Sequence, residues 1–144
     1  MGKVEWHRLV WVAFIVLKHA IVAWMAIINR LPTKDRLKSW GLEVDDRCVP
    51  CRKAGETRNH LFYECEFSQG IWKEILKLCG KQREVTSWNE EFQWAIMRLK
   101  RKSLASIIMR MAWHAVIYTT WVERNNRIHT GKEGTMIQRL EQIK

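Results

Sequence analysis

The apolar residues of this chain recur mainly at the three- and four-residue spacing of an amphipathic helix. The pattern over residues 19–30 predicts a helix that ends before Pro32, because the residue that precedes a proline avoids the α conformation. The longest pattern covers residues 103–126 and predicts a long core helix. Residues 10–17 are rich in Val, Ile, Trp and Phe, and they fit either a strand or an earlier part of the first helix.

Capping signals divide the rest of the chain into shorter helices. Predicted N-caps precede helices over residues 34–40, 60–64 and 69–79 and a helix containing Phe92, Ile96 and Leu99; they are Thr33, Thr57, Ser68 and Ser87, the last forming a capping box with Glu90. Gly41 and Gly80 follow two of these helices, as C-terminal glycines do. The low counts of seven Gly and two Pro argue against an all-β fold. We therefore expect a mainly α protein, a small helical domain.

Nine tryptophans are many for 144 residues and indicate large packing side chains. We expect Trp24 and Trp72 to be buried and to join the first helix to the helix over residues 69–79. The apolar stretch over residues 9–28 is a poor membrane span, because Lys18 and His19 would lie near the middle of the bilayer.

The net charge of +10 is unevenly distributed. Residues 98–144 carry ten basic and three acidic side chains, whereas residues 45–80 carry six of each. Such a surplus fits a polyanionic partner, either nucleic acid or an anionic membrane surface, and fits a solvated basic surface about as well.

Enzyme motifs are absent from the sequence. It has no Gly-rich phosphate loop, no Gly-x-Ser-x-Gly and no His-Glu-x-x-His. Asp45 and Asp46 are adjacent on a predicted turn and would seldom converge on one atom, and His114 fits a core position better than a general base. We expect no enzymatic activity and no small-molecule substrate.

The sharpest chemical pattern is Cys48-x2-Cys51-x8-His60-x4-Cys65. Zinc binds four thiolate or imidazole ligands tetrahedrally, and a set of three cysteines and one histidine leaves no position for water. The pattern therefore predicts a structural zinc site in a loop-helix segment near the middle of the chain. The alternative is three reduced cysteines and a satisfied histidine, but their turn-like surroundings argue against it. Cys79 lies on the apolar side of a predicted helix and is expected to be a core residue.

A series of motifs resembles the zinc-binding domain of plant non-LTR retrotransposon reverse transcriptases. In order, they are Trp24-Met25-Ala26, residues 29–37, Trp40-Gly41, Cys48-Val49-Pro50-Cys51, Glu56-Thr57, His60-Leu61-Phe62, Cys65 and Trp72. Residues 121–128 are similar to a Trp-x-Glu-Arg-Asn-x-Arg segment that often follows this domain. The resemblance covers about residues 6–79 and implies that the same four cysteine and histidine residues bind Zn²⁺.

The resemblance also implies a domain organisation and an activity. Residues 1–80 would form the reverse-transcriptase-type zinc-binding domain, and residues 81–144 a helical C-terminal extension packed on it. Paired aspartates of a polymerase palm are not recognisable here, so we expect no polymerase activity. A zinc-binding, nucleic-acid-associated module in the nucleus or cytoplasm is the expected function. The alternative is a structural or protein-interaction module derived from a retroelement.

The Cys-Cys-His-Cys order is similar to that of zinc knuckles, which contact single strands through basic and aromatic residues. The candidate contacts to RNA or single-stranded DNA are Arg47, Arg52, Lys53 and Arg58 beside the ligands and Arg98, Lys100, Arg101 and Lys102 in a second cluster. The second cluster also fits a solvated turn between helices. Tyr63 fits a surface ring that stacks on a base, whereas Phe62 fits core packing better. Basic clusters that share one face would favour nucleic acid, and an exposed Trp and Met patch would favour a protein partner.

Overall fold

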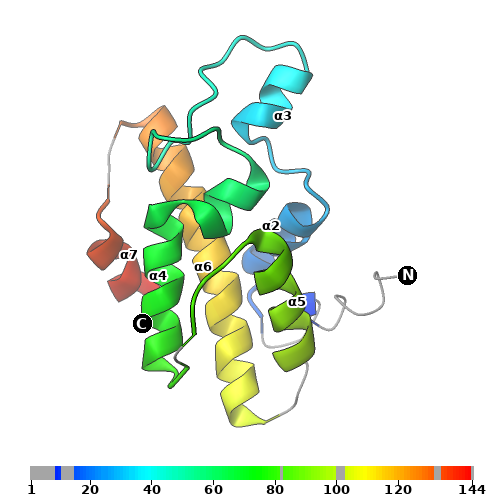
Figure 1. The fold of residues 1–144 in the computed structure, drawn as a ribbon, viewed down its shortest axis with the longest axis vertical. Helices are drawn as coiled ribbons and strands as arrows, with labels where there is room; N and C mark the ends of the chain where they lie inside the picture. The colour runs from blue at the N-terminus through cyan, green and yellow to red at the C-terminus, as the bar shows by residue number, and fades with distance from the viewer. Residues whose placement is uncertain (1–8, 11–14, 82, 100–102, 132–133, 144) are drawn as a thin grey trace.

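The computed structural model describes residues 9–10, 15–81, 83–99, 103–131 and 134–143. These residues form helices and no strand apart from one isolated bridge between Arg47 and Gly55, which confirms the prediction of a mainly α protein. The elements are α2 (Leu17–Ile27), α3 (Lys34–Ser39), the π-helical turn η1 (His60–Glu64), α4 (Glu66–Leu78), α5 (Trp88–Arg98), α6 (Leu104–His129) and α7 (Met136–Ile143), as Figure 1 shows. Among the described helices, none combines the length and the apolar character that a membrane crossing requires.

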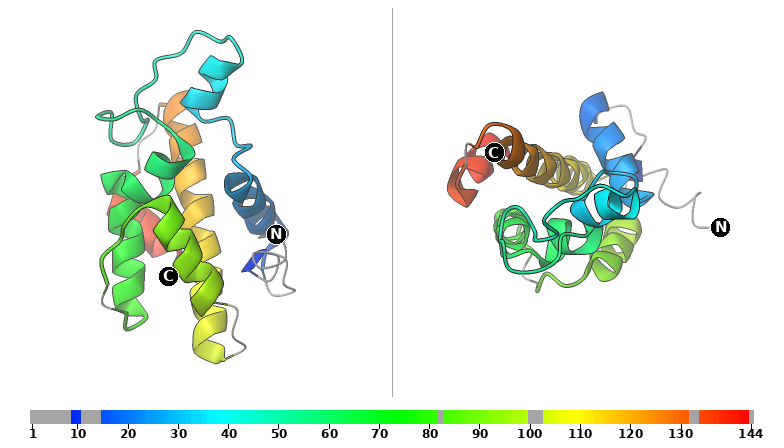
Figure 2. Two further views of the ribbon diagram at one scale, coloured as in Figure 1. Left: turned by 45° about the vertical axis from the view of Figure 1, so that its right-hand side comes forward. Right: turned by 90° about the horizontal axis from the view of Figure 1, so that it is seen from above.

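Helix α6 runs along the molecule and contacts most of the other elements. Helix α2 packs on one side of α6, and α4, η1 and α5 pack on another, while α7 lies against α4 and α6 (Figures 1 and 2). Helix α3 and the loop before η1 lie at the end of the molecule where α6 finishes. The C-terminal end of α6 is thus near the predicted zinc ligands.

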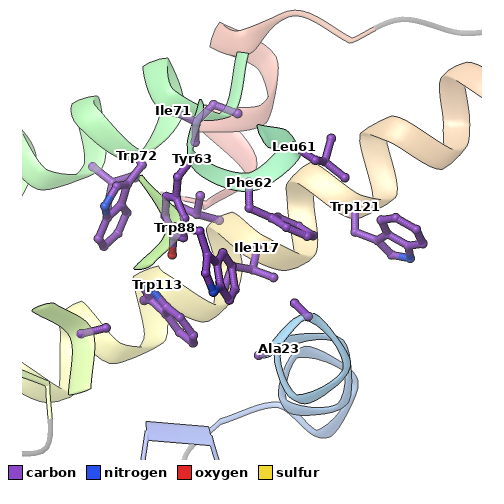
Figure 3. Close-up of a cluster of buried hydrophobic side chains, with 14 of the residues drawn as sticks. Ala23, Leu61, Phe62, Tyr63, Ile71, Trp72, Trp88, Trp113, Ile117 and Trp121 are labelled. Atoms are coloured by element: carbon purple, nitrogen blue, oxygen red, sulfur yellow. The ribbon is translucent and has the colours of Figure 1, made fainter. Parts of the chain in front are cut away.

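An aromatic cluster fills the core between η1, α4, α5 and α6 (Figure 3). Trp88 lies at its centre, with ring centroids 6.1 Å from Phe62 and 5.4 Å from Tyr63. Phe62 is therefore a core residue, as expected, but Tyr63 is fully buried and the prediction of a surface ring is wrong. The reason is that α4, α5 and α6 all contact the short η1 turn, so three consecutive side chains, including Leu61, are buried.

The prediction that Ser87 caps a helix is confirmed, because Ser87 accepts the Glu90 amide at the start of α5. Thr33 stands at the N-cap of α3 without a side-chain bond to a helix amide. Ser103, which is not among the predicted caps, accepts the Ser106 amide and caps α6. The prediction for Ser68 is wrong. Ser68 is not the cap of α4, because the helix begins at Glu66 and Cys65 is its N-cap. The η1 turn leads directly into α4, so Ser68 is buried inside the helix and its hydroxyl donates to the Cys65 carbonyl at 3.1 Å.

Helix α2 occupies most of the region predicted as helical and ends in a left-handed turn. The Asn29 and Arg30 amides donate to the carbonyls of Ala26 and Met25, and Asn29 has a φ of 56°. These are the two bonds of a Schellman motif, in which a left-handed residue ends the helix. The chain thereby turns from α2 into α3. Of residues 10–17, which fit a strand or an earlier part of the first helix, 11–14 lie outside the described residues. Val10 is helical, Ile15 and Val16 are not, and α2 begins at Leu17.

The predicted joining of the first helix to α4 by two buried tryptophans is wrong. Helix α2 buries its alanine face, Ala20, Ala23 and Ala26, and Trp24 is 37% exposed on another side. Trp72 is buried as predicted, but its ring lies 6.1 Å from that of Trp94 on α5. Small alanine side chains let α2 approach α6 closely, so a large ring is not needed there.

Truncating the two tryptophans should therefore have very different effects. Trp72→Ala removes a fully buried ring and the N–H that donates to Glu91 at 3.0 Å, so we expect a loss of about 3–5 kcal/mol in the free energy of unfolding. Trp24→Ala should cost about 1 kcal/mol or less, as surface substitutions do. Urea titrations followed by circular dichroism measure both. Equal losses would contradict this arrangement.

His114 should make stability depend on pH. It is buried in α6, its Nδ1–H donates to the Arg110 carbonyl at 2.9 Å, and burial lowers its pKa from 6.5 to about 4. Above pH 6.5 the His114 imidazole is neutral in both the folded and the unfolded protein. Between pH 6.5 and about 4 it gains a proton only in the unfolded protein, so the unfolded state is favoured as the pH falls. Stability should fall by about 3 kcal/mol over this interval and then level off. His114→Gln should remove this loss, so that its free energy of unfolding varies less with pH between 6.5 and about 4. Identical plots of unfolding free energy against pH for variant and wild type would exclude the effect of His114.

Candidate metal centre

A tight turn places Cys48 and Cys51 on the same side of the loop. The Arg52 amide donates to the Cys48 carbonyl at 2.8 Å, and the Cys48 amide donates to the Ala54 carbonyl at 2.7 Å. Arg52 has a φ of 58°, a left-handed conformation that lets the chain reverse after Cys51. The bridge between Arg47 and Gly55 closes the loop at its base. These bonds fix the conformation of the loop that carries Cys48 and Cys51.

The η1 turn presents His60 and Cys65 to this loop. Thr57 accepts the His60 amide with its hydroxyl at 3.1 Å, as an N-cap does. The Cys65 amide then donates to the His60 carbonyl at 2.6 Å, a bond that spans five residues and gives the turn its π-helical form. The wide turn brings the first and last residues of the segment together.

The four predicted ligands converge in space. One Cys Sγ or His nitrogen from each of Cys48, Cys51, His60 and Cys65 lies within 4.8 Å of the others, and Cys51 Sγ is 3.2 Å from His60 Nε2. Tetrahedral zinc, with bonds of about 2.0 Å to nitrogen and 2.3 Å to sulfur, needs ligand atoms about 3.5–3.8 Å apart. The observed separations and the soft donor set fit zinc. Zinc held by all four would have no open coordination position, as in structural zinc sites.

The electrostatics of the cluster favour a thiolate at Cys65. A hydrogen bond from Cys48 is the largest cause that lowers the pKa of Cys65, to about 6, and the amides of Phe67 and Ser68 at the start of α4 contribute. The same bond, with burial, raises the pKa of Cys48. A bound metal would displace the proton that the two sulfurs share. Cys79 packs against the core and is not part of the cluster.

Buried charged residues hold the metal-binding loop in place. Glu56 is fully buried, and its carboxylate accepts the Val49 amide of the loop at 3.1 Å and the Lys34 amide of α3 at 3.0 Å. The Arg124 guanidinium of α6 donates to the same carboxylate, at 2.7 and 3.1 Å. Arg127, one turn further along α6, donates to the Pro50 carbonyl at 3.1 Å, between the first two ligands.

Sequence reasoning did not predict these roles. Glu56, Arg124 and Arg127 belong to motifs that carry the family resemblance, but their positions in the sequence do not predict which residues they bind. One signal is visible in retrospect: Arg124 lies one helical turn from Trp121 on one side and from Ile128 on the other. A charge at such a position must find a buried partner. Arg124 finds this partner in Glu56. The adjacent Glu123, also buried, accepts from Arg127 at 2.6 Å and from Arg139 of α7 at 2.7 Å.

The candidate nucleic-acid contacts separate into exposed and engaged side chains. Arg47, Arg52 and Lys53 are exposed on the loop, with Arg47 paired to Asp45 and Lys53 paired to Glu66. Arg98 is exposed at the end of α5. Lys100, Arg101 and Lys102 lie outside the described residues, and so does the comparison of the faces on which the two basic clusters lie.

Arg58 has a structural role instead of the predicted surface role. Its guanidinium donates to the carbonyls of Ala26 and Ile27 at the end of α2, at 3.3 and 3.0 Å. It also lies over the Trp88 ring, 4.5 Å from the centroid. Half-buried and bound on both sides, Arg58 has little surface left for a phosphate. Helix ends attract cations because their last carbonyls lack partners, which explains this position.

Comparison with known proteins identifies the family. The family model described as zinc-binding in reverse transcriptase matches residues 1–72. No curated protein and no solved structure matches the chain. The matched region contains all four residues of the cluster, and a family of zinc-binding domains agrees with the donor set. This chain belongs to the zinc-binding domain family of reverse transcriptases.

Proposed function

We propose that this chain is a zinc-stabilised module that binds single-stranded nucleic acid and has no catalytic role. The observation that carries the proposal is the convergence of four ligand atoms within 4.8 Å, from Cys48, Cys51, His60 and Cys65. Zinc bound by all four would cross-link the loop to both ends of η1 and supply rigidity, not reactivity. Residues 1–80 form the zinc-binding part in this proposal, and residues 81–144 the helical extension that packs on it.

Exposed cations beside the metal centre support a polyanionic partner. Arg47, Arg52 and Lys53 project from the loop of a chain whose net charge is +10. The ion pairs that Arg47 and Lys53 form are exposed, and such pairs are worth about 0–1 kcal/mol, so phosphates can compete with the carboxylates. Arg98, with Lys100, Arg101 and Lys102, remains a proposed second contact region. A nuclear or cytoplasmic location is part of the same proposal.

A second function, protein binding, is favoured by an apolar groove of about 570 Å³ between α4, α6, α7 and the start of α2. Val16, Leu78, Ile108 and Met111 line it and are each at least 47% exposed. Light scattering tests this second function. It would be supported if the chain bound no nucleic acid but self-associated, and if Leu78→Asp and Met111→Asp abolished that self-association.

Zinc content tests the metal assignment. Purified wild type should carry one zinc per chain, and Cys51→Ser or His60→Ala should lower the content because either change removes a ligand. Chelation should increase hydrogen exchange over residues 45–80, since binding energy at a closed site is also folding energy. Cys79→Ser is the matched control and should keep full zinc. Full occupancy in a Cys48→Ser, Cys51→Ser double variant would refute the assignment. Elemental analysis gives the count.

Salt dependence tests the nucleic-acid partner. The affinity for a labelled single strand should fall as salt is raised from about 50 to 200 mM. In a plot of log affinity against log salt concentration, each phosphate contact should add about 0.7 to the slope. Arg52→Gly removes a cation where the φ of 58° suits glycine, so the loop should keep its shape while the slope falls. Lys53→Ala should act similarly.

Lys77→Ala is the matched control for Lys53→Ala, because Lys77 also belongs to an exposed ion pair, with Glu74 on α4, but lies outside the metal-binding loop. The control should retain wild-type affinity. If wild type and the loop variants bind equally weakly at low salt, the nucleic-acid proposal fails.

A further inference from the structure

A surface hollow of about 470 Å³ lies between α2 and α3, away from the metal-binding loop. Six residues line it: Trp24, Met25, Ile28, Arg30, Arg36 and Trp40. Helix α2 supplies the first wall, the turn after it supplies Arg30, and α3 with its C-cap supplies the other wall. In Figure 1, α3 lies at the end of the molecule and α2 lies below it, joined to it by a short loop.

The tryptophans of this hollow are unusual within the chain. Trp40 is 53% exposed and Trp24 is 37% exposed, whereas the other tryptophans among the described residues are buried or half-buried. Both exposed indole rings thus line the same hollow. Two indole rings that expose apolar surface in one hollow point to contact with another molecule.

Positive charge accompanies the two rings. The Arg36 guanidinium lies over the Trp40 ring, 5.4 Å from its centroid, and Arg30 is exposed at the edge of the hollow. The Nε of Arg36 is buried without a hydrogen-bond partner in the described structure. None of the six lining residues is acidic. The hollow therefore combines flat aromatic surface with donors for an anion.

The walls of the hollow are held in place by bonds already described. The left-handed turn at Asn29 fixes the direction in which the chain leaves α2. The first amide of α3, that of Lys34, donates to the buried carboxylate of Glu56. Because the same carboxylate holds the metal-binding loop, the hollow and the metal centre share one rigid support.

We propose that this hollow binds an unpaired nucleotide of a single strand, with the base stacked on Trp40 or Trp24 and a flanking phosphate bound by Arg36 and Arg30. This inference rests on the proposed nucleic-acid function and gives it a second contact site. Bases of single strands expose their faces to aromatic side chains, whereas duplex bases are already stacked on each other. A purely apolar protein partner would leave two guanidinium groups desolvated without an anion, which is costly.

The test compares two labelled oligonucleotides of equal length, an oligothymidylate and its abasic counterpart, which carry the same phosphates. With the zinc-loaded full chain, Trp40→Ala and Trp24→Ala should each weaken oligothymidylate binding by about five- to 150-fold, the effect of one lost stacking contact. Binding of the abasic strand should change little. Trp40→Phe retains a stacking face and should keep most of the affinity.

Further variants separate charge from stacking and report on folding. Arg36→Ala and Arg30→Ala should weaken both oligonucleotides and lower the salt slope by about 0.7 each. Met97→Ala, a change at a side chain of α5 that is 60% exposed, is the control and should leave both affinities unchanged. Zinc content and circular dichroism should remain at wild-type values in every variant, which shows that lost affinity is not lost folding.

The outcomes distinguish this inference from the proposed function. Absence of binding by wild type to either strand would overturn both. Wild-type binding that the two tryptophan variants leave unchanged would overturn the nucleotide site alone, and the hollow would then be a surface for a protein side chain. Equal loss on the abasic and the thymidylate strands in Trp40→Ala would also overturn base stacking.

Discussion

The buried ion pair between Glu56 and Arg124 is the interaction on which the rest of this structure depends. A carboxylate without solvent is expensive unless a counter-charge and several hydrogen bonds replace its hydration. Here the carboxylate accepts backbone amides from the metal-binding loop and from α3, and a guanidinium from a helix 68 positions later in the sequence. The metal-binding loop, α3 and α6 are thereby joined at one side chain. Removing either partner would leave the other charge buried and unpaired.

The metal centre is supported by this network and does not stand alone. Glu56 binds the Val49 amide and Arg127 binds the Pro50 carbonyl, so both residues between the first two cysteines are fixed by groups that are not ligands. Outer groups of this kind orient ligands and increase metal affinity. Zinc and the ion-pair network therefore stabilise the same loop, and loosening of one weakens the other. The bond from the Lys34 amide to Glu56 also fixes the position of α3, and α3 forms one wall of the hollow that contains Trp24 and Trp40.

Periodicity and spacing predicted the helices and the residues that converge as a cluster, because both are local properties of a sequence. The predictions that failed depended on neighbours. Trp24 is exposed because α2 packs through alanines, and Tyr63 is buried because three helices surround one short π-helical turn. The partner of Glu56 could not be predicted for the same reason, since an ion pair between residues 68 positions apart leaves no periodic pattern in the sequence. Only a charged residue at an apolar position of α6 hinted at it.

The bonds from α6 to the loop have a consequence for inheritance of the module. The family signature stops at residue 72, yet the guanidinium groups that hold the loop come from residues 124 and 127. Recombination just after residue 72 would transfer all four metal ligands without Arg124, and the carboxylate of Glu56 would then be buried without its counter-charge. An intact zinc centre therefore requires a stretch of gene well downstream of the cysteines, the part that encodes α6.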